Sequence, residues 1–90
     1  MANIRGIKKD INFLTGEVIS DCFTFMYLYP DKKREEALDI ISDAADLRNS
    51  LVERVNTKPE GKAKAHYNAI FQDLLNGVDS NFKRISELTK

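Results

Sequence analysis

Four carboxylates recur at helical spacing near the middle of the chain. Glu36, Asp39, Asp43 and Asp46 follow one another at intervals of three or four residues, so they share one face of a helix. Carboxylate oxygens are the ligands that magnesium prefers in proteins. This acidic row is therefore the first candidate for metal-assisted chemistry, provided that a facing helix supplies a second row.

The segment Glu35-Glu36-x-x-Asp39 resembles half of the carboxylate arrangement that binds magnesium in helical nucleotide pyrophosphatases. The resemblance implies a metal-assisted nucleotide hydrolase. The chain departs from that pattern, because it has no matching second row and the carboxylates point away from the expected core. Only a dimer through this face would complete the site. A solvated acidic face is the favoured interpretation, so we assign no metal, cofactor or catalytic residue and keep the hydrolase as the alternative.

His66 and Cys22 are the only histidine and the only cysteine, and together they are the one possible imidazole–thiol pair. Their expected heights along a helical bundle differ by about 15 Å at 1.5 Å per residue. That separation argues against a catalytic pair, and we expect a structural role for each. A single cysteine also excludes a disulfide within the chain.

Arg48 is predicted to lie near the centre of the apolar face of the second helical segment. That face is expected to include Leu38, with Ile40 at its edge. A buried guanidinium needs a partner, because an unpaired buried charge is very costly, and Glu17 and Asp73 are the candidates. A structural ion pair or an outward-reaching arginine is favoured, and an anion-binding Arg48 is the alternative.

Asn81 falls on the expected buried face of the third helical segment. A polar residue in a helical core often fixes the register of the helices around it. We therefore interpret Asn81 as a buried polar residue with a structural role, and not as a ligand.

Three long segments with apolar residues at three- and four-residue steps carry all of these side chains. Helices are predicted over about 3–29, 32–56 and 59–88. Tyr29-Pro30 ends the first, because the residue before proline is pushed out of the α region, and Asp31 is the predicted N-cap of the second. No alternating β pattern is present. The sequence predicts an all-α, up-down-up bundle of three long antiparallel helices that forms one domain over 1–90.

Two glycines interrupt the helical pattern. Gly16 matches Ala44 and Ala45 by height along the bundle, so we predict a close approach of two helices at that point. Gly77 lies inside the third segment, where glycine costs about 1 kcal/mol relative to alanine. A break near Gly77, which would give a four-helix bundle, is the alternative architecture.

Charge and hydropathy limit the classes of partner. Fourteen basic and fourteen acidic side chains cancel, so the chain lacks the global attraction that nucleic-acid or anionic-membrane binding usually needs. There is no apolar run of signal-peptide or membrane-spanning length, and we expect a cytoplasmic protein without a membrane partner.

Basic residues nevertheless gather at one end of the predicted bundle. Seven basic against three acidic residues leave a local excess of about four positive charges, which makes nucleic-acid binding a third, less favoured hypothesis because no aromatic side chain lies among them to stack on a base. The basic residues are Arg5, Lys8, Lys9, Arg54, Lys58, Lys62 and Lys64, and the acidic ones are Asp10, Glu53 and Glu60.

The first helical segment carries more apolar surface than two neighbours can cover. Its main apolar stripe, predicted to face inward, includes Ile7, Ile11, Leu14, Val18, Cys22, Phe25 and Tyr29. At about 100° per residue, Phe13, Phe23 and Tyr27 face away from this stripe, and Leu28 lies at the margin. An apolar helix face is normally buried. We therefore expect these four residues to form an interface, most simply in a homodimer and otherwise with another helical protein. The predicted function is a non-catalytic interaction or structural module.

Overall fold

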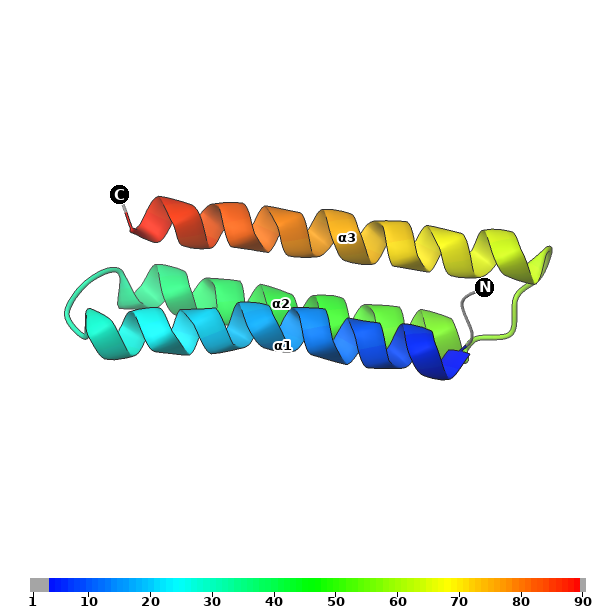
Figure 1. Cartoon of the computed structure of the whole chain (residues 1–90), viewed down its shortest axis with the longest axis horizontal. Helices are drawn as coiled ribbons and strands as arrows, with labels where there is room; N and C mark the ends of the chain where they lie inside the picture. Colours follow the sequence, from blue (N-terminus) through cyan, green and yellow to red (C-terminus); the bar gives the residue numbers. More distant parts are fainter. Residues whose placement is uncertain (1–3, 90) are drawn as a thin grey trace.

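Three helices make up the computed structural model, which describes residues 4–89 (Figure 1). They are α1 (Ile4–Leu28), α2 (Arg34–Asn56) and α3 (Ala63–Leu88). The helices run up, down and up, and each packs against the other two. The described chain contains no strand and forms a rod of 48 × 19 × 18 Å. The predicted all-α three-helix bundle is confirmed.

The first connection is a tight turn that begins at Tyr29. The Tyr29 backbone N–H donates to the carbonyl of Phe25, and the Lys32 N–H donates to the carbonyl of Tyr29 at 3.1 Å. Pro30 suits the second position of such a turn because its φ is already fixed. The turn occupies 29–32, so α2 begins at Arg34 and not at residue 32. Its N-cap is Lys33, in the left-handed conformation (φ 49°), and the prediction of Asp31 as the cap was wrong.

The second connection is longer than expected. Residues 57–62 link α2 to α3, so α3 begins at Ala63 and the prediction of a start near residue 59 was wrong. The carbonyls that end α2 are satisfied before the chain leaves the helix. Thr57 donates its backbone N–H and its hydroxyl to the carbonyl of Glu53, at 3.0 and 2.8 Å. Residue 3, the predicted first residue of α1, lies outside the described residues.

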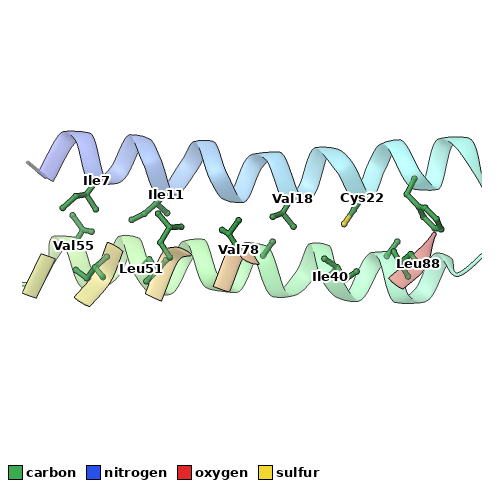
Figure 2. Packing of buried hydrophobic residues seen from close by; sticks show 14 residues of the cluster. Ile7, Ile11, Val18, Cys22, Ile40, Leu51, Val55, Val78 and Leu88 are labelled. Atoms are coloured by element: carbon green, nitrogen blue, oxygen red, sulfur yellow. The ribbon is translucent and has the colours of Figure 1, made fainter. Parts of the chain in front are cut away.

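The helix α3 is continuous over its 26 residues. No break occurs at Gly77, and the alternative of a four-helix bundle was wrong. The buried core runs the whole length of the rod, and Figure 2 shows Ile7, Ile11, Val18 and Cys22 pointing toward the side chains of the facing helices. The fully buried members beyond α1 include Ala37, Ile40, Ala44, Leu51, Val55, Ile70 and Leu74.

The rotation of α2 about its own axis differs from the sequence prediction. Ile40 is 1% exposed and central to the core, whereas Leu38, expected to face inward, is 43% exposed. The alanines of α2 fit equally well in the core or at its edge, so helical periodicity alone does not determine which face of α2 points inward. The face that carries Ile40, Ala44 and Leu51 is the one that packs against both α1 and α3.

The close approach predicted at Gly16 is instead at Gly77. A Cβ added at Gly16 would meet nothing within 4 Å, so the prediction of a helix contact there was wrong. A Cβ at Gly77 would meet the side chain of Leu47. Gly16 does lie at the height of Ala44, but it faces away from the bundle.

Candidate interaction surface

Both α2 and α3 pack on the same side of α1, which leaves the opposite side bare. We call Phe13, Phe23 and Tyr27 the outer face of α1; their side chains are 63%, 55% and 84% exposed. The buried side of the same helix carries Ile11 and Val18, which are fully buried. Phe13, Phe23 and Tyr27 are therefore exposed on the same side of α1, with Phe13 and Phe23 about 15 Å apart along the helix axis.

Leu28 lies at the edge of the outer face, on the side toward α3, and is 60% exposed. It lines a groove of about 300 Å³ between the C-terminal ends of α1 and α3, together with Phe25 and Ile85. Tyr29, expected on the inward stripe, follows the last residue of α1 and is 47% exposed; its ring lies 5.2 Å from that of Phe25. The apolar surface thus continues from Leu28 into the groove.

Leu38, which was predicted to face the core, is exposed and extends the apolar surface on the side toward α2. The Nε of Arg48 donates to Oδ1 of Asn12 at 2.7 Å, so these two residues lie opposite each other in the antiparallel pair of α1 and α2. Counted from that pair, Phe23 lies opposite residue 37, next to Leu38. Two large exposed apolar side chains, from two helices, therefore lie at the same height.

Arg48 is exposed, so the prediction of a buried arginine was wrong. Its guanidinium bonds to two amides, Oδ1 of Asn12 and, at 2.9 Å, Oδ1 of Asn49. Neither Glu17 nor Asp73 is its partner in these contacts. The rotation that brings Ile40 into the core carries Arg48 to the edge of α2, where water and neutral acceptors satisfy its charge.

Asn81 is buried, with 6% of its surface exposed. Thr15 is a further buried polar residue, which was not predicted from the sequence; it is fully buried and donates its hydroxyl to the carbonyl of Ile11 at 2.6 Å. Thr15 comes four residues after Ile11 and three before Val18, so its position on the apolar stripe was the available signal. A threonine hydroxyl bonded to its own helix fits a core at little cost.

The acidic row does not assemble into a metal site within one chain. Its four residues are exposed on α2, and Asp43 already forms an ion pair with Arg84 of α3. Glu36 and Asp39 border a groove of about 230 Å³ with Arg84 and Glu87. Residues 4–89 contain no group of three or more His, Cys, Asp or Glu that could hold a metal ion. The hydrolase hypothesis stays a prediction that rests on sequence.

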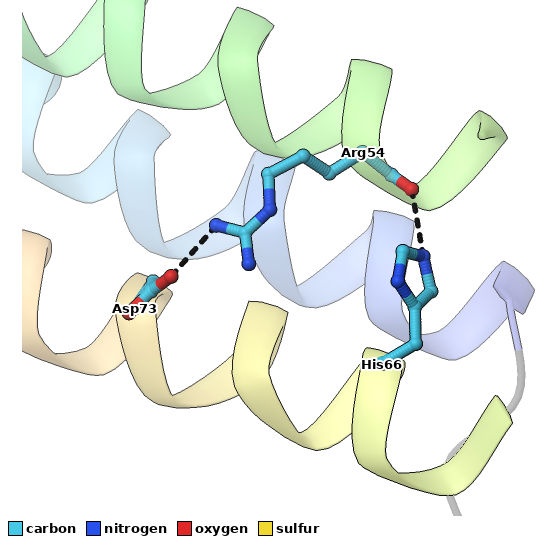
Figure 3. A network of polar contacts seen from close by, with 3 residues as sticks. All are labelled: Arg54, His66 and Asp73. Atoms are coloured by element: carbon cyan, nitrogen blue, oxygen red, sulfur yellow. Dashed lines mark hydrogen bonds and ion pairs between the residues drawn. The ribbon is translucent and has the colours of Figure 1, made fainter. Parts of the chain in front are cut away.

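His66 and Cys22 are separated, and each has a structural environment. The Nε2 of His66 lies 3.0 Å from the carbonyl oxygen of Arg54 near the C-terminus of α2, and the Arg54 guanidinium reaches Asp73 at 2.7 Å (Figure 3). Cys22 is fully buried. Burial raises the pKa of its thiol, the Asp21 carboxylate raises it further and the Arg84 guanidinium lowers it.

The basic end combines the start of α1, the end of α2 and the start of α3, as predicted from their directions (Figure 1). Arg54 is held by Asp73 and is thus not available as a free cation there. The rings of His66 and Tyr67, with centroids 4.9 Å apart, also lie at this end, near the start of α3, and both residues are half-buried. Nucleic-acid binding stays a prediction that rests on sequence. None of the helices within 4–89 is both long and apolar enough to span a bilayer.

Comparison with known proteins identifies no relative: no family model, no curated protein and no solved structure matches this chain.

Proposed function

We propose that this protein is a helical protein–protein interaction module that self-associates through the outer face of α1. The observation that carries the proposal is the exposure of three aromatic rings on the one side of α1 that the bundle leaves uncovered. Soluble monomers rarely present large contiguous apolar patches, and such patches usually mark interaction sites. No catalytic group is part of the proposal.

The exposed area is in the range that a weak or moderate interface needs. Aromatic side chains offer about 150–250 Å² each, so the exposed fractions of Phe13, Phe23 and Tyr27 correspond to roughly 400 Å² per chain. Two copies supply about 800 Å² from the rings alone, and the helix surface between the rings brings the total near the ~1,000 Å² of specific interfaces.

The size of the bundle favours the same conclusion. A rod 18–19 Å across has little interior, because each helix meets only two others and a chain of this length buries a modest fraction of its surface. Association through α1 would give that helix a third neighbour. Its apolar outer residues would then be covered as its inner ones already are.

Substitution of one ring with a charge tests the proposal. Phe23→Glu removes an aromatic contact and places a carboxylate in the interface, so the dissociation constant measured by sedimentation should rise about tenfold or more. Phe23 is exposed in the monomer, so the fold should persist, which circular dichroism checks. Ala69→Glu introduces the same charge at an exposed position of α3 and should leave association unchanged. Equal behaviour of the two variants would refute the proposed face.

A further inference from the structure

We infer that the second copy binds the outer face of α1 in antiparallel orientation, about a two-fold axis at the height of Val18. The inference rests on the proposed function and adds to it the direction and register of the contact. It follows from a self-complementary order of side chains along the exposed side of α1. In chain order these are Lys9, Phe13, Gly16, Ser20, Phe23 and Tyr27, all exposed.

When two copies of this series of side chains run in opposite directions, each side chain meets one of similar size or complementary chemistry. When one copy is turned about the height of Val18, residue i meets residue 36 − i of the other copy. Phe13 then meets Phe23, and Gly16 meets Ser20. Aromatic pairs contribute beyond their area alone. At the centre, a Cβ at Gly16 would meet nothing within 4 Å, so the two smallest side chains leave room for the helices to approach closely between the two aromatic pairs.

Each end of the contact pairs a cation with an aromatic ring. Under the same rotation Lys9 meets Tyr27, the most exposed of the three outer rings at 84%, and an ammonium over a tyrosine ring is attracted to its face. The basic residues of α1 all lie in its first turns, as Arg5, Lys8 and Lys9, whereas residues 10–31 contain no lysine or arginine. An antiparallel pair therefore brings the basic start of one helix to the cation-free half of the other.

The parallel alternative has the opposite electrostatics. It would place Arg5, Lys8 and Lys9 against the same residues of the second copy, which is repulsive. It would also align the two helix dipoles, whereas antiparallel helices pair opposite ends.

Cysteine cross-linking in the full chain distinguishes the two orientations. In the antiparallel pair, residue 9 of one copy lies beside residue 27 of the other, whereas the two copies of residue 9 are about 27 Å apart along the helix. We prepare Lys9→Cys and Tyr27→Cys as separate proteins, one of them with a size tag, and oxidise each alone and as an equimolar mixture. The unsubstituted protein is the control, because Cys22 is fully buried and should give no covalent dimer.

The expected result is a covalent dimer in the mixture, composed of one tagged and one untagged chain, and none from either variant alone. Covalent dimers of a single variant would overturn the antiparallel inference and leave self-association standing. Absence of every cross-link from variants that sediment as dimers would overturn the register and orientation. If the unsubstituted protein sediments as a monomer, the proposed function and the inference fail together, so the two failures are distinguishable.

Discussion

Leu47 of α2 occupies the space that a side chain at Gly77 of α3 would fill. A Cβ added at Gly77 would lie 2.7 and 2.9 Å from the two Cδ atoms of Leu47, closer than packed carbon atoms approach one another. Leu47 is part of the layer packed against the core. The glycine thus allows the leucine side chain of α2 to pack directly against the backbone of α3.

This contact predicts opposite effects of alanine at the two helical glycines. Gly16→Ala should raise the free energy of unfolding by about 0.5–1 kcal/mol, because alanine is the better helix former and the site is open. Gly77→Ala gains the same propensity but forces Leu47 out of its position, so we expect no gain or a loss of about 1 kcal/mol. Urea unfolding at low protein concentration in a Phe23→Glu background, where association is weakened, measures both.

The control is Gly77→Ala in a variant whose Leu47 side chain has been removed. In a Leu47→Ala background the obstacle is gone, so Gly77→Ala should become stabilising by about the propensity difference of 0.5–1 kcal/mol. Equal effects of Gly77→Ala in the two backgrounds would show that Leu47 is not what the glycine accommodates.

His66 is expected to stabilise the end of α2. Its Nε2 lies 3.0 Å from the carbonyl oxygen of Arg54 in the last turn of α2, a carbonyl that also accepts the Thr57 backbone N–H at 3.2 Å. His66→Ala should lower the free energy of unfolding by about 1 kcal/mol. His66→Gln keeps an N–H donor and should recover part of the loss, and a His66→Ala variant as stable as the unsubstituted protein would contradict the role.

Cys22 should make stability depend on alkaline pH. Burial raises the pKa of the thiol in the folded chain above its ordinary value of 9.0. Between the unfolded and the folded pKa the unfolded chain has lost the proton and the folded chain retains it, so the free energy of unfolding falls as pH rises. There is no such effect below the unfolded pKa, where the thiol is neutral in both states.

The measurement compares Cys22→Ala with the unsubstituted protein across pH 8 to about 10.5, a range around the thiol pKa. The substitution costs a constant amount from lost packing, and the difference between the two proteins should shrink above a pH of about 9 as the thiol contribution is lost. A difference that stays constant over this range would show that the thiol ionises equally in both states.

The inward face of α1 and its exposed apolar residues could be predicted from the sequence. One strong apolar stripe defines the buried side of the helix, and the remaining apolar residues then fall on the opposite side. Ile7, Ile11, Val18 and Cys22 were predicted to face inward and are buried. The exposure of Phe13 and Tyr27 followed from the same periodicity, since both are on the opposite side of the helix.

The rotation of α2 could not be predicted in the same way. Its alanines are compatible with two neighbouring lines of contact, and the choice between Leu38 and Ile40 depends on how α3 packs against it. The same error in the rotation of α2 led to the prediction that Arg48 lies in the core, whereas it lies at the edge of the helix. The close helix contact was predicted at Gly16 and occurs at Gly77 for a related reason. The height of a residue along the bundle follows from counting residues, but whether it faces a neighbouring helix depends on where that helix packs.

The central claim is that the outer face of α1 is covered by a second copy in solution. Sedimentation equilibrium of the unsubstituted 90-residue protein over a concentration series up to tens of micromolar tests it most directly. We predict a mass that rises with concentration toward twice the 10.3 kDa of one chain and a Phe23→Glu variant that stays closer to that value. A mass of one chain at every concentration would contradict the claim.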